Sequence, residues 1–314
     1  MYYPYFRGKQ FDLITIRETA ALMARCGFVP IIEPVKDVLG GLERALKSLV
    51  DVGAKSVVVI NPFHGDHAED GTQIEDFLIE KFAKDRLVSP GINLDAGMSV
   101  QQAMDLYADH ITLDPVFIHA GFSDGKGLAE ALGASLDTST HVFIDNQSVK
   151  AYRRHFKSAQ RVLVKDGFNR LQRNADYPPL EIFSDLHVSF DEEGMDGFGD
   201  FLTVGNDFRE GGGPAYAVAI HLTYIDSDKD DVMYIHHFVS VDKDTPTDPA
   251  GKFKQALDLL VDEVNAKGSK IIRGEAVREF LELHSKGHFP GLGQVKKLSM
   301  KHHIETLAAY LVKE

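Results

Sequence analysis

Cysteine and long apolar runs are scarce in this chain of 314 residues. The one cysteine, Cys26, excludes an intramolecular disulfide and fits a reducing compartment. No apolar run approaches the roughly 18 residues that cross a bilayer. The first ten residues also lack the apolar core of a signal peptide. We therefore expect a cytoplasmic protein that makes no contact with a membrane.

Several motifs that identify a reaction class are also absent. The chain contains no Walker A loop, no C-x-x-C and no G-x-G-x-x-G after its first strand run. These absences exclude the strongest P-loop and dithiol classes. They also argue against an open, doubly wound sheet that binds a dinucleotide.

Basic residues are fewer than acidic ones: the chain has 34 Lys and Arg against 47 Asp and Glu, which gives a net charge of −13. This balance argues against non-specific nucleic-acid binding by the surface as a whole. The charge is uneven, because residues 150–173 hold eight bases and one acid, whereas residues 181–210 hold nine acids and one base. A solvated basic helix beside an acidic loop explains the pattern most simply. The alternative is a local phosphate or nucleic-acid contact beside an acidic mouth that could bind a metal.

Short apolar runs alternate with helical patterns along most of the chain. Most of these runs are continuously apolar, which is typical of parallel strands covered on both faces. Eight such units predict a (β/α)8 TIM-like barrel of the α/β class. The expected strand runs are 28–35, 56–62, 87–95, 110–118, 141–146, 161–166, 182–190 and 215–225.

The remaining segments complete this predicted architecture. Residues 1–9 are expected to be a short extended capping segment, and 1–268 the barrel region. Residues 269–314 are expected to form a helical C-terminal extension packed on the barrel. Between strands seven and eight lies an irregular loop, 191–214, longer than most connections in a compact domain. We predict that it is an ordered lid over the strand ends, hinged near Gly194 and Gly211 to Gly213.

Several short blocks resemble one known family. The opening YYPYFRGKQFDLITIRE, followed by PIIEPV, is similar to the start of the phage-type "beta protein" family, although Arg7 stands where a lysine is more usual. The block FGDFLTVG, the glycine-rich turn and the block YIHHFVS resemble later parts of those proteins. The resemblance implies a barrel-like fold and a prokaryotic or viral setting, and it implies no activity.

Chemically useful side chains follow several of the expected strands, where barrel enzymes carry their functional groups. Converging carboxylates serve acid–base chemistry or a divalent cation, and a strand-end lysine suits a Schiff base or a phosphate. Each acid has a structural alternative as a helix cap, and the lysine as a buried ion pair. The candidate catalytic residues are Glu33, Asp145, Lys165, Asp185, His187 and His221. The candidate ligand-binding residues are Asn61, Asp95, Asp200, Thr203, Asn206 and Tyr224.

Two functional hypotheses of different class stay open. The first is an enzyme, a hydrolase or lyase acting on a phosphate-bearing or nucleotide-like small molecule, for which a divalent cation would suit the carboxylates. The loop residues His64, Asp66 and His67 suit a metal by type but are weak evidence by spacing. The second is a non-catalytic recognition component of a phage-related or phage-defence system. It would bind a protein partner through residues 191–214 and 150–173. The fold does not decide between the two.

Overall fold

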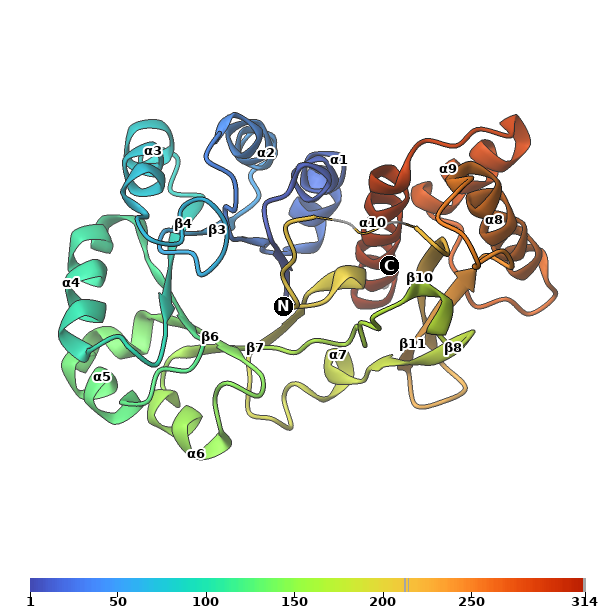
Figure 1. Cartoon of the computed structure of the whole chain (residues 1–314). Helices are drawn as coiled ribbons and strands as arrows, with labels where there is room; N and C mark the ends of the chain where they lie inside the picture. Colours follow the sequence, from blue (N-terminus) through green and yellow to red (C-terminus); the bar gives the residue numbers. More distant parts are fainter. Residues whose placement is uncertain (212, 214, 313–314) are drawn as a thin grey trace. The chain divides into compact units, whose positions relative to one another are not determined.

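Eight parallel strands close into a barrel in the computed structural model, which describes residues 1–211, 213 and 215–312. The order around the barrel is β1-β2-β3-β4-β5-β6-β7-β9, and β9 pairs with β1 to complete the circle (Figure 1). This closure confirms the predicted (β/α)8 class. The strands are β1 (Tyr2–Phe6), β2 (Ile31–Ile32), β3 (Ser56–Val59), β4 (Val88–Leu94), β5 (Val116–His119), β6 (Thr140–Ile144), β7 (Gln160–Val164) and β9 (Gly197–Asp200).

Helices connect the first seven strands and surround them on the outside of the barrel (Figure 1). The longer ones bury apolar residues on one face, for example Leu42, Ala45, Leu46 and Leu49 of the second helix. Ser99 begins one of them as a capping box, accepting a hydrogen bond from the Gln102 N–H at 3.2 Å, as its spacing predicts. The helices are α1 (Gln10–Cys26), α2 (Gly40–Val50), α3 (Thr72–Phe82), α4 (Val100–His110), α5 (Gly125–Leu132) and the short α6 (Lys150–Arg153).

Alternate residues of the strands fill the barrel interior. The buried cluster contains Tyr3, Tyr5, Val29, Ile31, Val57, Val59, Val116, Ile118, Val142, Ile144, Val162, Val164 and Phe201. On β4 the inward position is Gly91, where an added Cβ would lie 2.9 Å from Cγ1 of Val57. The interior is therefore a packed core, and functional groups must lie at an end of the barrel.

The extended conformation expected for residues 1–9 is confirmed over Tyr2–Phe6, but the capping role is wrong, because this stretch is the first strand of the barrel. Tyr5 pairs with Ile31 of β2, and Tyr3 pairs with Gly199 of β9. Its tyrosines alternate between the interior and the helix layer, which is the pattern of a barrel strand.

The predicted lid at residues 191–214 is also wrong, because residues 197–200 form β9 and close the barrel between β7 and β1. The runs expected to be strands seven and eight, 182–190 and 215–225, do not enter the barrel, and their strand residues, 182–184 and 219–225, belong to a separate sheet. The proposed hinge at residues 211–213 includes Gly212, which lies outside the described residues. Four predicted site residues are consequently not at barrel strand ends: Asp185, His187, His221 and Tyr224.

The separate sheet has the order β10-β11-β8 and is antiparallel throughout. Its strands are β8 (Leu180–Ser184), β10 (Ala219–Asp226) and β11 (Val232–Val239), and the short α7 (Leu186–Ser189) follows β8. The helices α8 (Pro249–Asn265), α9 (Glu275–Lys286) and α10 (Leu292–Leu311) share one apolar core with β10 and β11. Asp248 and Pro249 begin α8 as predicted, with the Asp248 carboxylate accepting from the Gly251 N–H at 2.9 Å.

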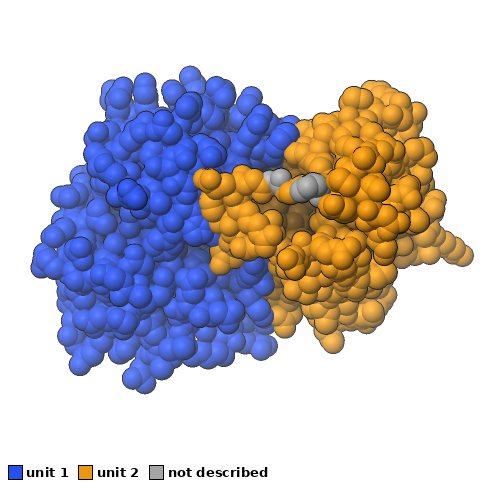
Figure 2. All heavy atoms as spheres, viewed as in Figure 1, with its two compact units in different colours: residues 1–166, 189–201 blue, residues 167–188, 202–314 orange. Residues whose placement is uncertain are grey.

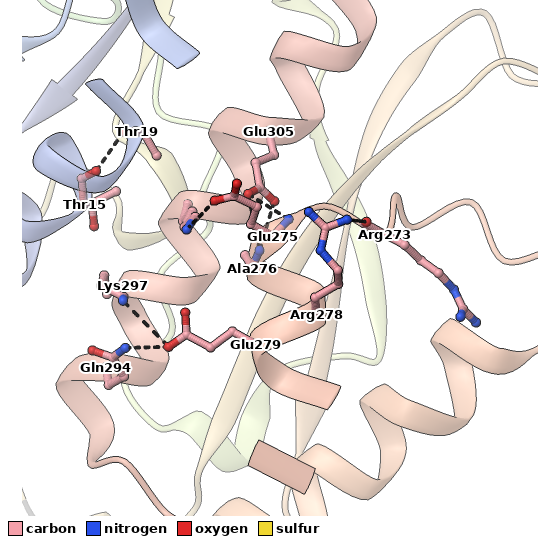
Figure 3. A network of polar contacts seen from close by, with 11 residues as sticks. Thr15, Thr19, Arg273, Glu275, Ala276, Arg278, Glu279, Gln294, Lys297 and Glu305 are labelled. Carbon is pink, nitrogen blue, oxygen red and sulfur yellow. Dashed lines mark hydrogen bonds and ion pairs between the residues drawn. The ribbon is translucent and has the colours of Figure 1, made fainter. Parts of the chain in front are cut away.

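Polar contacts join the last two helices (Figure 3). The carboxylate of Glu305 on α10 accepts hydrogen bonds from the N–H groups of Glu275 at 3.0 Å and of Ala276 at 3.2 Å. It thereby satisfies donors that the first turn of α9 leaves without helical partners. Glu279 accepts from Gln294 at 2.8 Å, which adds a second tie between the two helices.

The chain divides into two compact units (Figure 2). Unit 1 comprises Met1–Asp166 and Ser189–Phe201 and contains the barrel. Unit 2 comprises Gly167–Val188 and Leu202–Glu314 and contains the three-stranded sheet with α8, α9 and α10. The predicted boundary between residues 268 and 269 does not coincide with this division. No helix among the described residues is both long and apolar enough to cross a membrane.

Candidate functional site

The carboxyl ends of the barrel strands carry five of the predicted site residues on one rim. Glu33 follows β2, Asn61 follows β3, Asp95 follows β4, Asp145 follows β6 and Lys165 follows β7. Because all eight strands are parallel, these positions share one end of the barrel. A common rim for Glu33, Asp145 and Lys165 was the central expectation for the site, and the strand order confirms it.

The Glu33 carboxylate is fully buried, and its oxygens are committed to neighbouring groups. Its Oε2 atom accepts a hydrogen bond from the Tyr5 hydroxyl at 3.0 Å and forms an ion pair with Arg7. Its Oε1 atom accepts from the N–H of Phe63 at 2.9 Å. Because three donors already contact this carboxylate, it has little capacity left to act as a base. We therefore assign Glu33 a structural role at the rim.

Aromatic rings complete this ion pair. The Arg7 guanidinium carbon lies 5.1 Å from the ring centre of Tyr5 and 5.3 Å from that of Phe201. Burial and the adjacent Glu33 carboxylate raise the pKa of Tyr5 well above its usual value, so the hydroxyl stays protonated and donates. Sequence reasoning missed Arg7, Tyr5 and Phe201 as rim residues. Arg7 could be identified as a rim residue from the sequence only if residues 2–6 were recognised as a strand.

Asn61 and its neighbour Asn93 tie β3 to β4 at the rim. The Asn61 amide donates to the Asn93 carbonyl at 2.8 Å, and the Asn93 N–H donates to Asn61 Oδ1 at 2.8 Å. Asn93 is fully buried, and its Oδ1 atom has no hydrogen-bond partner among the described residues. A buried acceptor of this kind is a place for an ordered water or a ligand donor. Asn61 itself is engaged in holding the strands together.

Asp145 and Lys165 are neighbours on the rim, because they continue the register that pairs Ile144 with Val164. Both side chains are half-buried, and within the described residues neither is hydrogen-bonded or ion-paired. Strand β6 is the fourth from β2 around the circle, so Asp145 lies across the barrel mouth from Glu33. The three predicted groups share a rim, but the described residues show no contact that joins them into one cluster.

Asp95 and Asp200 have structural partners in the barrel unit. The Asp95 carboxylate accepts from the N–H groups of Gly97 at 2.7 Å and Met98 at 2.9 Å, which closes the turn after β4. Asp200 is buried and accepts from the Tyr2 hydroxyl at 2.8 Å, on the side of the strands away from the barrel interior. Both side chains therefore have structural partners, although not as the helix caps expected from the sequence.

The other six predicted site residues belong to unit 2: Asp185, His187, Thr203, Asn206, His221 and Tyr224. Nε2 of His187 lies 2.9 Å from the Asp231 carbonyl, and the Tyr224 ring stacks on Tyr234 with 5.6 Å between ring centres. Thr203 is buried in a 3-10 turn. The twelve predicted residues are thus divided equally between the two units.

A metal site is not formed by the predicted loop residues. His67 is buried, and its Nε2 atom lies 3.2 Å from the carbonyl of Lys36, while Asp66 accepts from the N–H of Asp37 at 2.9 Å. Within residues 1–211, 213 and 215–312, no group of three or more His, Cys, Asp or Glu side chains is arranged to hold a metal ion.

A pocket of about 370 Å³ opens beside this rim, between the first turns of α1 and α2. Gly8, directly after Arg7, and Pro34, directly after Glu33, form part of its wall. Gly8 has φ +61, and a Cβ there would lie 2.8 Å from the Glu33 carbonyl oxygen, so this wall requires glycine. The apolar lining residues are Leu13, Ile14, Pro34, Val35, Val38, Leu39 and Leu42.

Three cationic side chains line the same pocket: Arg17 from α1, Lys36 from the loop after β2, and Arg44 from α2. Lys36 lies 4.0 Å from Asp66. Among the described residues no hydrogen bond or ion pair engages the guanidinium of Arg17 or Arg44, and none of the lining residues is acidic. Sequence reasoning missed this pocket, because its residues come from two helices and a loop rather than from strand ends.

Comparison with known proteins adds no identity. No family model matches the chain, and no curated protein matches it. One solved structure is similar, the "Truncated form of 3-deoxy-D-arabino-heptulosonate 7-phosphate synthase from Thermotoga maritima". It shows 11% sequence identity and a TM-score of 0.37, over 64% of this chain and 75% of that chain. The barrel assignment therefore stands on the strand pairing itself, and the resemblance to the beta proteins stays a prediction.

Proposed function

We propose that this chain binds a small anionic molecule, a phosphate ester with an apolar portion, in the pocket between α1 and α2. The observation that carries the proposal is the joint presence of Arg17, Lys36 and Arg44 around an apolar pocket of about 370 Å³. Arginine presents several N–H donors in a planar fork that matches phosphate geometry, so such a lining favours this ligand class.

The charge of the whole chain strengthens the local argument. A chain with net charge −13 repels anions at long range, so a pocket lined by cations and no described acid is a local exception. The apolar wall provided by Leu13, Ile14 and Leu42 would take the uncharged part of the ligand. This division of polar and apolar lining supports a ligand with two chemically distinct ends.

The pocket borders the rim without using Glu33 as a reactive group. The Glu33 carboxylate is hydrogen-bonded or ion-paired to Tyr5, Arg7 and Phe63. Its role is therefore to fix the backbone at the adjacent wall residues Gly8 and Pro34. The hydrolase or lyase hypothesis would need Asp145 and Lys165 to act on the ligand, and no described contact links them to the pocket. Binding is therefore the function that the geometry supports best.

Calorimetric titration with phenyl phosphate tests the proposal, because this probe combines a phosphate with one apolar ring. We expect the intact chain to bind it, and Arg17→Gln or Arg44→Gln to raise Kd about tenfold, since each removes a charge-assisted hydrogen-bond donor. Lys47→Gln is the matched control, because Lys47 is an exposed cation of α2 that does not line the pocket. Its Kd should stay within about twofold of the original.

Absence of binding by the intact chain would contradict the proposal. Equal weakening by the control and the two arginine variants would also contradict it, because it would point to a general charge effect. Circular dichroism of each variant separates loss of binding from loss of fold.

A further inference from the structure

Three titratable side chains form a row across the sheet of unit 2. Glu181 lies on β8, His237 on β11 and His221 on β10, and His221 is the register partner of His237. Nε2 of His237 lies 3.0 Å from the Glu181 carboxylate, and its Nδ1 lies 2.7 Å from Nδ1 of His221. The three strands therefore hold a continuous hydrogen-bonded chain from a carboxylate to a half-buried histidine.

The chemistry of the groups sets the direction of these hydrogen bonds. An ionised carboxylate only accepts, so the proton between Glu181 and His237 must lie on Nε2 of His237. In a neutral His237 the Nδ1 atom is then an acceptor, and Nδ1 of His221 must carry the donated proton. The consequence is that Nε2 of His221 holds a lone pair, and no hydrogen bond to it is found among the described residues.

The surroundings favour the neutral imidazoles that this reasoning needs. Burial lowers the pKa of His221 well below its usual value, and His237 and Lys296 add to the shift. Burial also lowers the pKa of His237, against the opposing effect of Glu181, while His236 lowers it further. The rings of Phe168 and Tyr177 stand edge-on to His221 at 5.0 Å and 4.9 Å between centres. Burial raises the pKa of Tyr177, so this wall stays uncharged.

We propose that His221 is the proton-accepting group of a second site, in unit 2, that takes an activated ester as its substrate class, with His237 and Glu181 as positioning residues. Water donates a proton to Nε2 of His221 while its oxygen forms a bond to the ester carbonyl carbon. The bond to the leaving oxygen then breaks, and that oxygen departs with the electron pair. The imidazolium is stabilised through His237 by the Glu181 carboxylate and later returns its proton to solvent.

This inference is independent of the pocket in unit 1, since it shares no residue with it. The probe is p-nitrophenyl acetate, whose leaving group is followed by its colour. His221→Gln should lower the hydrolysis rate at least about tenfold, in keeping with the usual contribution of general-base catalysis. His236→Gln is the matched control, because His236 is also half-buried and adjacent in sequence but points to the opposite face of the strand. Its rate should be unchanged.

The positioning role of Glu181 has its own readout. Glu181→Gln removes the charge that favours protonated histidine, so the midpoint of the pH–rate profile should move to lower pH in this variant. Nitrogen-15 spectra of the imidazoles should show the proton of His221 on Nδ1 in the unaltered chain. A proton on Nε2 of His221, or an equal loss of rate in the His221 and His236 variants, would overturn the proposal.

Discussion

At the scale of single residues, Arg7 and Glu33 form a buried ion pair. Burying two charges costs free energy unless both are paired and hydrogen-bonded, and here Tyr5 and Phe63 supply the extra donors. The pair sits where β1 and β2 end and fixes the turns that carry the pocket wall. Loss of one partner should therefore be felt more strongly than loss of both.

Removal of Glu33 alone is the corresponding stability prediction. Glu33→Leu should lower the free energy of unfolding by about 3–5 kcal/mol, because it leaves the buried guanidinium of Arg7 without its counter-charge. The double variant Arg7→Leu with Glu33→Leu should lose less than the single variant. Urea denaturation measures both, and a cost below about 1 kcal/mol for the single variant would contradict the assigned role.

For Lys165, in contrast with Glu33, we expect a substitution to change the free energy of unfolding very little. Lys165 is half-buried. The hydrogen bond from Lys150 is the main cause of the lowered pKa of Glu193, and the Lys165 ammonium adds to it only at longer range. Lys165→Met should change the free energy of unfolding by no more than about 0.5 kcal/mol, the range usual for surface substitutions. A loss of several kcal/mol in urea denaturation would instead reveal a buried ion pair.

Among the elements, β9 decides whether the barrel closes. Its sequence GFGD holds two glycines and no β-branched residue, so propensity favours the nearby run AIHLTYI as a strand. That run does form a strand, but it pairs with β11 in the antiparallel sheet of unit 2 rather than in the barrel. Barrel class was predictable from the six middle strands. The first and last strands were not, because closure depends on close backbone approach rather than on apolar runs.

Gly199 tests this explanation of β9. An added Cβ would lie 2.2 Å from the Tyr3 carbonyl oxygen, so the two strands could not pair with a larger residue there. Gly199→Val should cost more than about 4 kcal/mol or prevent folding. Gly211→Ala is the control, because a Cβ added at Gly211 would meet no heavy atom within 4 Å, and the stability of this variant should be nearly unchanged. Thermal unfolding by circular dichroism compares the two, and a stable Gly199→Val protein would refute the closure argument.

Across the whole molecule, several buried histidines make stability depend on pH. Nε2 of His119 lies 2.8 Å from Nδ1 of His141, and burial lowers the pKa of His141 to about 3 and that of His119 well below its usual value. In unit 2, burial lowers the pKa of His302 to about 4. These histidines are neutral in the fold near pH 5, whereas unfolded histidines bind protons below about pH 6.5.

Stability should therefore fall as the pH drops from 7 to 5, because the unfolded chain takes up more protons than the folded one. Each such histidine should contribute a loss of roughly 2 kcal/mol at pH 5. His119→Gln should reduce this dependence, because glutamine can accept from Tyr152 and donate to His141 without titrating. Urea denaturation at several pH values measures the slope, and equal stability at pH 7 and pH 5 would contradict the neutral assignment.

The candidate site was harder to predict from the sequence than the fold, because it depends on how side chains are used and brought together in the whole folded molecule. Strand-end acids such as Asp95 are as useful for closing turns as for chemistry, and a single sequence does not separate the two uses. The pocket residues Arg17, Lys36 and Arg44 come together only when α1 packs against α2 beside the rim. The spacing of these residues in the sequence does not indicate that they line one pocket.

Backbone amide spectra of the nitrogen-15-labelled chain, titrated with phenyl phosphate, test the central claim most directly. If the ligand enters the pocket between α1 and α2, the amide signals of Gly8, Arg17, Lys36 and Gly41 should shift with one common Kd. The signals of the three-stranded sheet in unit 2 should stay in place. Shifts confined to other residues, or no saturable shift at these four, would contradict the account.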